Sequence, residues 1–433
     1  MLIIHLLNYS RIYFQNSLRR HIFLLAILAL SFAIITSVTT ITQGMITNIT
    51  HAAEFHYGGH LFLLGLGASK HLVPEPEKII AAARSSGLAF NKAVLRTQDY
   101  IDGILYFGGS SLKQKYVFGI DWEAERESFQ RQDLLAGDFT KELPPNGIII
   151  SSSTAAELRL RLNDDVILEV NTLTGQKNTA RLVVWGIIED KSIFGYFKCY
   201  ISRQTANSLL GFKEDECSWI GLYFDQSDPV FLKGQATKLF NALKTGFPLT
   251  SIVNSREELS RELRSSHHRL EIAVVTLTAY ISQVSELLEA IRLLSYFLYS
   301  LMVLIALSSL IVSYRLILHE RIEELGTMRV FGLSQGSLVL LLLGESLFVY
   351  ALSFILGLLL AFGLNELLAM FSYDWIPGFD ILLEKGKLSA SYKINIFLTN
   401  IFIVFFTTIP AVVFLAIKVA QADLIKVLKG EAL

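Results

Sequence analysis

Side chains that are able to ligate a metal gather in one short stretch, at His51, Glu54, His56 and His60. Proteins usually present such ligands about four residues apart on a helix, or on a fixed turn. Here the first two histidines are five residues apart, and two glycines precede the last one. This spacing favours a polar junction between two structural elements. We therefore predict no metal site and keep a metal cluster as the weaker alternative.

Other catalytic and cofactor-binding signatures are absent from the sequence. It has no G-x-x-x-x-G-K-[ST] phosphate loop, no G-x-G-x-x-G opening a helix, no G-x-S-x-G and no H-E-x-x-H. The sequence has two cysteines, Cys199 and Cys217, which is too few for a disulfide framework. Whether they form one bridge with each other is left undecided. We predict a chain that is not an enzyme and binds no cofactor. Any ATP and Mg that it depends on would be bound by a partner chain.

The composition indicates a membrane protein with a sizeable soluble part. Hydrophobic residues make up 52% of the 433 residues and charged residues 18%, against about 25% charged residues in soluble domains. Membrane lipid is therefore an expected contact. The net charge of −1 gives no footprint for a nucleic-acid partner.

Four stretches almost free of charge locate the membrane helices. A span needs about 20 apolar residues, and each stretch reaches that length. The stretches are 22–41, 293–314, 330–365 and 394–417, and only Glu345 interrupts the third. We predict four transmembrane helices. The alternative for the first, a cleaved signal peptide, is disfavoured because its apolar run is too long.

Glu345 is an acid inside an apolar stretch, and two interpretations of it are open. A carboxylate within the membrane marks a functional site by default. Because Glu345 lies near one end of its stretch, we favour the milder interpretation, in which it reaches the interface or caps a helix contact.

Basic residues flank the four stretches unequally, and this predicts the orientation of the chain. They concentrate at both termini and between the second and third stretches, at Arg11, Arg19, Arg20, Arg315, Arg321, Arg329, Lys418, Lys426 and Lys429. These segments are predicted to be cytoplasmic. Residues of about 43–291 then lie outside.

The outer segment 58–255 is predicted to be a mixed α/β domain. Strands are expected where apolar or alternating runs occur, at 61–66, 115–120, 147–150, 166–170, 181–188 and 219–224. Helices are expected after Pro76, from a capping box at Thr154, and over about 229–244. The predicted fold class is an α-helical membrane protein with four transmembrane helices and a large mixed α/β extracytoplasmic domain on helical stalks.

A heptad-like apolar seam ahead of the second span predicts a stalk helix. Its members alternate four and three residues apart, and neither Pro nor Gly occurs between Ser255 and Tyr314. The seam comprises Leu270, Val274, Leu277, Ile281, Val284, Leu288 and Ile291. We expect one unbroken helix from about residue 256 into the membrane. Local packing of the seam on the protein's own domain is the alternative.

The loop His319–Gly336 between the second and third spans has the form of a docking surface. Ile322, Leu325, Met328 and Val330 tend to one side of a helix, and balanced charges lie elsewhere. The alternative is a helix at the lipid interface. Such a helix should be richer in Lys and Arg than this one.

At this loop the sequence resembles a known family. Glu324–Gly332 reads E-L-G-T-M-R-V-F-G, with Glu345 in the apolar helix that follows, and this resembles the signature of FtsX-like ABC transporter permeases. The tail Lys418–Glu431 resembles the family's closing segment at Asp423 and Leu428. The resemblance implies an ATPase-coupling loop whose residues are Arg321, Glu324, Leu325, Gly326, Met328, Arg329 and Gly332.

Within this family the layout is similar to the MacB and lipoprotein-releasing (LolC/LolE-type) branch. Ser151–Val170 and the V-V-W-G-I run at 183–187 resemble that branch's outer domain, although Asn163-Asp164-Asp165 replaces its Gly-Asp turn. The resemblance implies a permease homo- or heterodimer with cytoplasmic ABC ATPase subunits that bind ATP and Mg. A periplasmic carrier or adaptor is a further expected partner.

The favoured function is the mechanical release of lipoproteins from the bacterial inner membrane. MacB-like export of drugs or peptides with a periplasmic adaptor is one alternative. FtsX-like regulation of a cell-wall hydrolase is another.

These inferences define the expected organisation of the chain. Its segments are a cytoplasmic N-terminus with transmembrane helix 1 (1–43), a stalk extension (44–57), the extracytoplasmic α/β domain (58–255), a stalk helix (256–292), transmembrane helix 2 (293–317), the cytoplasmic coupling loop (318–336), transmembrane helix 3 (337–366), a short extracytoplasmic loop (367–392), transmembrane helix 4 (393–418) and a cytoplasmic tail (419–433).

We predict a multi-pass protein of the inner membrane with both termini in the cytoplasm. Because basic flanks stay inside, a single cysteine placed in the loop 318–336 should be labelled from the cytoplasmic side alone. A cysteine in the loop 367–392 should be labelled from outside alone. Membrane-impermeant maleimide on intact cells measures both. Labelling of the loop 318–336 from outside would overturn this topology.

Overall fold

The computed structural model describes residues 18–67, 71–99, 103–189, 194–265, 269–373, 375–376, 379 and 382–421, and for 18–20, 99 and 283–286 the backbone alone. The tail at Asp423 and Leu428 therefore lies outside the described residues. The chain divides into two compact units. We call Met1–Thr47, Leu287–Trp375 and Gly386–Leu433 the membrane unit, and Asn48–Glu286 with Ile376–Lys385 the α/β unit.

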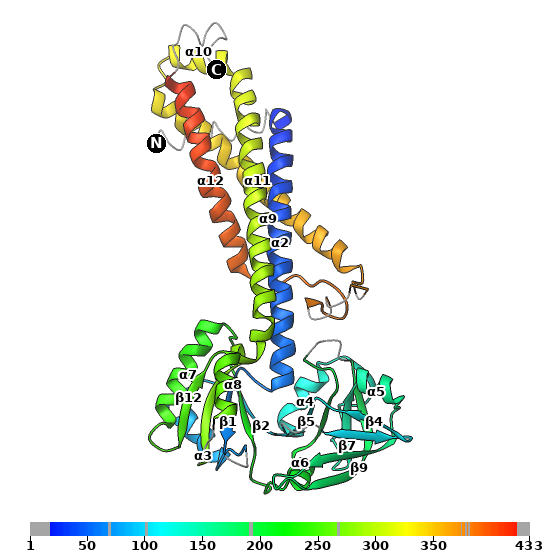
Figure 1. Cartoon of the computed structure of the whole chain (residues 1–433). Helices are drawn as coiled ribbons and strands as arrows, with labels where there is room; N and C mark the ends of the chain where they lie inside the picture. The colour runs from blue at the N-terminus through cyan, green and yellow to red at the C-terminus, as the bar shows by residue number, and fades with distance from the viewer. Residues whose placement is uncertain are drawn as a thin grey trace. The chain divides into compact units, whose positions relative to one another are not determined.

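Four long helices dominate the membrane unit, and each is long and apolar enough to cross a membrane (Figure 1). The helices in chain order are α2 (Leu18–Tyr57), α9 (Leu277–Glu320), α10 (Ile322–Val330), α11 (Gln335–Ala369) and α12 (Ile394–Gln421), of which α10 is the short one. The four long helices coincide with the four charge-poor stretches. The chain is therefore a membrane protein with four candidate spans.

Close backbone approach and internal hydrogen bonds hold the membrane helices together. At Gly357 of α11, a Cβ atom would lie 2.8 Å from the carbonyl oxygen of Ala29 in α2, so only glycine permits this contact. Near the same face, the side-chain amide of Asn365 donates to the hydroxyl of Thr40 at 3.0 Å. These contacts fix α2 against α11 inside the bundle.

The α/β unit is built on one sheet of thirteen strands in the order β12-β13-β1-β11-β2-β5-β10-β7-β9-β8-β3-β4, with β6 paired to β9. The strands are β1 (Leu61–Leu66), β2 (Lys92–Asp99), β3 (Ile104–Phe107), β4 (Ser110–Lys113), β5 (Tyr116–Ile120), β6 (Leu134–Gly137), β7 (Gly147–Ser151), β8 (Asp165–Asn171), β9 (Lys177–Ile188), β10 (Lys198–Ser202), β11 (Trp219–Tyr223), β12 (Leu249–Val253) and β13 (Glu271–Thr276). All six predicted strands are present within a few residues of their expected bounds.

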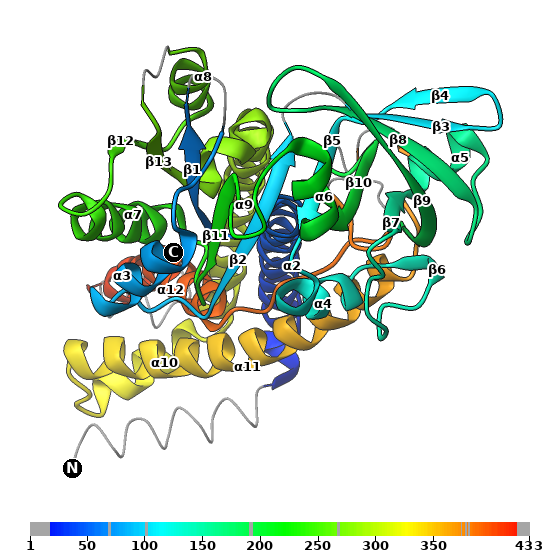
Figure 2. The same ribbon diagram turned by 90° about the horizontal axis from the view of Figure 1, so that it is seen from below.

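Short helices cover this sheet. They are α3 (Pro76–Ser85), α4 (Trp122–Gln130), α5 (Ser152–Leu158), α6 (Arg203–Leu210), α7 (Pro229–Leu243) and α8 (Arg256–Arg264). Figure 2 shows α3 beside α7, and α7 next to β12. The predicted capping box at Thr154 is wrong. The hydroxyl of Ser151 accepts from the Thr154 amide instead, so α5 begins one turn earlier.

The two long stalk helices, α2 and α9, each connect directly to a strand, and the two strands are neighbours in the sheet. The helix α2 ends at Tyr57, and β1 begins at Leu61. The chain turns between them at Gly58 and Gly59, which have φ of 78° and 146°. The strand β13 runs without a loop into α9, and β13 pairs antiparallel with β1. Where the two meet, the Leu277 amide donates to the His60 carbonyl at 2.9 Å. The two helices therefore leave the sheet from one ladder of backbone hydrogen bonds.

The prediction of an unbroken stalk helix from about residue 256 is wrong in its first half. The helix α8 ends at Arg264, and β13 intervenes before α9 begins at Leu277. Leu270 precedes that strand, and Val274 lies within it. The rest of the seam is in α9, at Leu277, Ile281, Val284, Leu288 and Ile291, with the Val284 side chain outside the described residues.

The physical reason is that β13 gains two strand partners that a free helix would not have. It pairs with β1 on one side and β12 on the other, and its residues 272–276 are fully buried. Its β-branched residues fit such a doubly covered strand well. In addition, so short a run of apolar residues spaced four and three apart is compatible with a strand that is buried on both faces. Tertiary pairing therefore overrides the helical pattern.

Both cysteines of the α/β unit are free and buried. Burial raises the pKa of both thiols, that of Cys217 to about 12. Because the thiolate is the reactive form, neither thiol should react with maleimide in the folded protein at pH 7.5, and both should react after unfolding. Mass spectrometry counts the adducts. Rapid labelling of either thiol in the folded state would contradict this burial.

Candidate coupling sites

The turn before α10 contains a buried ion pair. The Arg321 guanidinium donates through Nη1 to Glu345 Oε2 at 2.5 Å and through Nη2 to Oε1 at 3.4 Å. Arg321 is 1% exposed and Glu345 2% exposed, so both charges are inside the protein. Because Glu345 belongs to α11, the pair joins the start of α10 to a membrane helix.

Glu345 thus makes a helix contact, which agrees with the milder of its two interpretations. A second bond supports the same corner, because the Tyr314 hydroxyl of α9 donates to the Leu342 carbonyl of α11 at 3.1 Å. Replacing a buried pair by apolar residues is often neutral for stability, but removing one partner leaves an uncompensated buried charge. The pair therefore specifies one position of α10 relative to α11.

The predicted coupling residues divide into buried and accessible ones. Arg321, Leu325 and Gly326 are buried, so they position the loop and offer no surface to a partner. Met328 and Arg329 are half-buried, while the Glu324 side chain is 47% exposed. Gly332 is exposed with φ of 96°, which ends the helix in the left-handed region.

Sequence reasoning missed the most exposed apolar residue of this loop. Phe331 is 87% exposed and follows Val330, which is 57% exposed. The only signal in the sequence is a phenylalanine directly before the helix-ending glycine. A large aromatic side chain held in solvent at the tip of a fixed helix is a candidate anchor for another protein.

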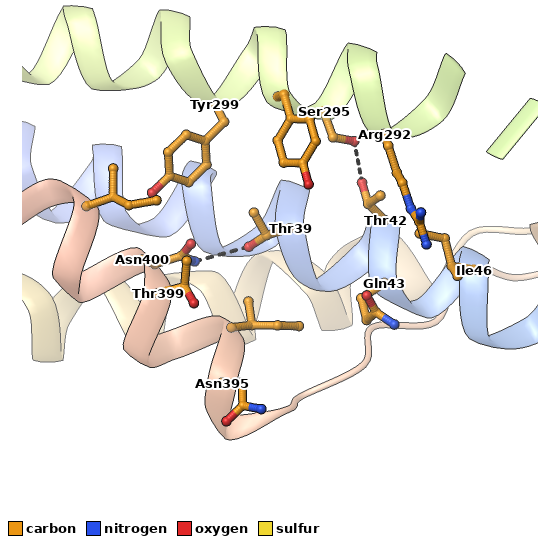
Figure 3. A pocket seen from close by; sticks show the side chains of 13 residues that line it. Thr39, Thr42, Gln43, Ile46, Arg292, Ser295, Tyr299, Asn395, Thr399 and Asn400 are labelled. Atoms are coloured by element: carbon orange, nitrogen blue, oxygen red, sulfur yellow. Dashed lines mark hydrogen bonds between the residues drawn. The ribbon is translucent and has the colours of Figure 1, made fainter. Parts of the chain in front are cut away.

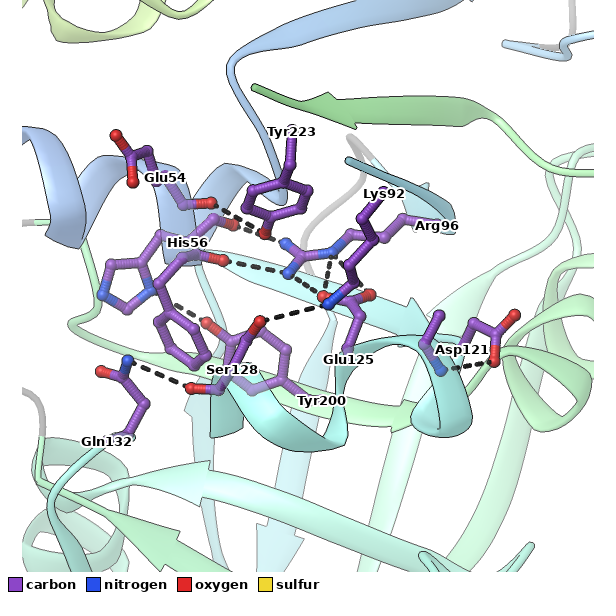
Figure 4. A network of polar contacts seen from close by, with 12 residues as sticks. Glu54, His56, Lys92, Arg96, Asp121, Glu125, Ser128, Gln132, Tyr200 and Tyr223 are labelled. Atoms are coloured by element: carbon purple, nitrogen blue, oxygen red, sulfur yellow. Dashed lines mark hydrogen bonds and ion pairs between the residues drawn. The ribbon is translucent and has the colours of Figure 1, made fainter. Parts of the chain in front are cut away.

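A second buried ion pair lies where α2 ends, in the α/β unit (Figure 4). Arg96 of β2 donates through Nη1 to the His56 carbonyl at 2.8 Å and through Nη2 to the Phe55 carbonyl at 3.0 Å. Its remaining donors contact Glu125 of α4, the shortest at 2.5 Å. Arg96 is 1% exposed and the Glu125 side chain 0% exposed.

This arrangement caps a helix end that is buried. The last carbonyls of a helix have no partner within the helix and carry partial negative charge. The Glu54 carbonyl accepts from the amides of Gly58 and Gly59, and Arg96 satisfies the next two carbonyls. A Cβ at Gly58 would lie 2.6 Å from Arg96 Nε, so the glycine makes room for this cap.

The candidate metal cluster resolves into separate hydrogen bonds around this junction. His60 Nδ1 accepts from the Phe224 amide at 2.9 Å, so its Nε2 carries the proton toward Glu54, 2.7 Å away. His51 also contacts Glu54, at 3.0 Å, whereas His56 turns to the Tyr200 hydroxyl at 2.9 Å. In the described part of the chain, no three His, Cys, Asp or Glu side chains converge as metal ligands.

A pocket of about 330 Å³ lies in the membrane unit between α2, α9 and α12 (Figure 3). Two hydrogen bonds between helices line it. Thr42 and Ser295 share a hydrogen bond of 2.6 Å, and the Asn400 amide donates to the Thr39 hydroxyl at 3.1 Å. Their polar groups satisfy one another, so they join the helices that form the pocket.

We predict that Glu125→Gln lowers the free energy of unfolding by about 3–5 kcal/mol, because Arg96 would keep a buried charge without its carboxylate. Chemical denaturation of the full chain in detergent measures this. The matched control is Glu127→Gln, which removes a carboxylate of the same helix from an exposed pair with Arg131 and should change nothing measurable. The double change Arg96→Met with Glu125→Gln should cost less than the two single changes added together. Additive costs would show that the two groups do not act as a pair.

A comparison with protein families matches one part of the chain. Residues 296–424 match the family model of the FtsX-like permease C-terminal region. No curated protein matches the chain in sequence.

Two solved structures are similar to part of the chain. One is the extracellular domain of the noncanonic ABC-type transporter YknZ from Gram-positive bacteria, with 14% identity and a TM-score of 0.29 over 42% of this chain and 94% of that one. The other is the periplasmic region of MacB from Actinobacillus actinomycetemcomitans, with 14% identity and a TM-score of 0.27 over 43% of this chain and 86% of that one. Residues 296–424 are therefore similar to the C-terminal region of FtsX-like permeases.

Proposed function

We propose that this protein is the membrane permease subunit of an ABC transporter, and that it transmits the work of a separate ATPase to its α/β unit. The observation that carries the proposal is the direct connection of two candidate spans to neighbouring strands. The helix α2 enters β1 and α9 leaves β13, and these two strands pair with each other. A displacement of the spans then acts on the sheet without a flexible linker.

The continuity of α2 supports this mechanical function. It is one helix of 40 residues, which corresponds to a length of about 60 Å at 1.5 Å per residue. The Arg96 cap holds its far end against β2 and α4. Within the membrane unit, Gly357 and Asn365 hold it against α11. A helix fixed in this way at both ends can carry force along its axis.

The loop with α10 is the proposed contact with the ATPase subunit, which would bind ATP and Mg. The Arg321–Glu345 pair ties the start of α10 to α11, so a push on α10 reaches the membrane helices. Phe331, Val330 and Glu324 offer the accessible surface. In this proposal Arg321, Leu325 and Gly326 orient the helix, whereas Phe331, Val330 and Glu324 meet the partner.

Lipoprotein release at the inner membrane is the proposed activity, carried out by a permease dimer. It rests on the resemblance of 151–170 and 183–187 to the lipoprotein-releasing branch. Purification of the intact complex tests the substrate class. A lipoprotein and its carrier should copurify. Copurification of a periplasmic export adaptor or a cell-wall hydrolase would instead support one of the two alternatives.

We predict that Phe331→Ala lowers the affinity for the cognate ATPase subunit by roughly tenfold, since truncating an exposed aromatic anchor typically costs more than 1 kcal/mol. Binding of purified ATPase to the permease in nanodiscs measures this. Gln335→Ala is the control, because Gln335 is exposed at the start of α11 but is not an apolar anchor. Unchanged affinity and unchanged ATPase stimulation in Phe331→Ala would exclude the tip of α10 as the docking element.

A further inference from the structure

The pocket between α2, α9 and α12 contains one charged side chain. Arg292 is the only one of its lining residues with a formal charge, and no carboxylate lines it. Arg292 makes no ion pair with any residue that the structure describes. Carboxylate oxygens, which a cation would need, are therefore missing. The charge of the pocket suits an anion.

The pocket is elongated and its walls are largely apolar. Its lining extends over about two turns of each helix, from Ile46, Arg292 and Ile396 at one end to Thr39, Tyr299 and Ile403 at the other. Figure 3 shows Arg292 and Gln43 at one end of the pocket and Tyr299 at the opposite end. The volume of about 330 Å³ lies within the usual range for small-ligand sites.

One polar group beside the pocket lacks a partner. The Tyr299 hydroxyl is buried and makes no hydrogen bond within the described part of the chain. A buried hydroxyl without a partner costs free energy. The hydroxyl is closed off from the pocket, so it is the ring of Tyr299 that contributes to the pocket wall. The pocket thus combines a cation at its rim with a largely apolar wall.

We propose that this pocket holds one phospholipid, with its phosphate on Arg292 and an acyl chain along α9 and α12. An arginine near the end of a membrane helix lies at the depth of the lipid headgroups, where its guanidinium binds phosphate through parallel N–H donors. A free phosphate would leave the apolar walls unused. An uncharged lipid would leave Arg292 unpaired. The site belongs to a resident lipid, so the proposal does not depend on what the permease transports.

The test counts phospholipid that stays on the purified full-length protein. Protein in nanodiscs of phosphatidylglycerol is transferred to detergent, washed, and analysed by native mass spectrometry. Wild-type protein should keep one phospholipid for each chain. Arg292→Gln should keep about tenfold less, because it loses a charge-assisted contact to phosphate. The control Arg315→Gln, an exposed arginine toward the other end of α9, should keep as much as wild type.

A second variant tests the cavity without touching the charge. Thr399→Trp places a large ring at the pocket wall and should expel the lipid while Arg292 remains. Unchanged thermal unfolding of each variant shows that it is folded. Equal retention in Arg292→Gln and wild type would overturn the proposal.

Three other results would also contradict it. Phosphate-free diacylglycerol that is retained as well as phosphatidylglycerol would mean that the pocket recognises acyl chains only. Displacement by a lipidated peptide but not by phospholipid would mean a substrate site. Loss of lipid on formation of a dimer would mean that a second copy fills the pocket.

Discussion

The end of α2 determines how the neighbouring elements of the α/β unit are arranged, because the helix there turns into a buried strand. In such a place the last helical carbonyls can be satisfied neither by the helix nor by water. Instead, the amides of Gly58 and Gly59 and the Arg96 guanidinium donate hydrogen bonds to these carbonyls. Arg96 in turn needs Glu125, since a guanidinium buried alone would be costly. Three elements distant in sequence are therefore fixed around one helix end.

A similar arrangement occurs in the membrane unit. Arg321 stands between α9 and α10, and its carboxylate partner Glu345 lies one helix further on. In both places a buried arginine meets a carboxylate of a helix, but Arg321 belongs to a junction between helices and Arg96 to the strand β2. Buried pairs of this kind add little net stability but exclude alternative packings once the fold has formed. Each pair thereby fixes the register of the elements that it joins.

The helices of the membrane unit are held in different ways along their length. Gly357 allows α2 and α11 to touch backbone to backbone, and Asn365 adds a hydrogen bond between them. On the other side, α2 meets α9 and α12 around a pocket that the protein does not fill. A close backbone contact thus lies on one face of α2, and a cavity bridged by two hydrogen bonds lies on the other.

The sequence by itself determined which segments are long and apolar enough to cross a membrane and where the loop between the second and third of them lies. Those features depend on runs of like residues, because about 20 apolar residues must be consecutive to span a bilayer. The six predicted strands and the helices after Pro76 and Pro229 are also local, since they follow from side-chain alternation and from helix-starting proline. Only the tertiary structure decided that Glu271–Thr276 form a strand, because pairing with β1 and β12 outweighed a helical spacing. It also decided the partners of Arg96 and Glu345, the exposure of Phe331 and the separation of His56 from Glu54 and His60. Each of these depends on contacts between residues far apart in the chain, for which no local pattern exists.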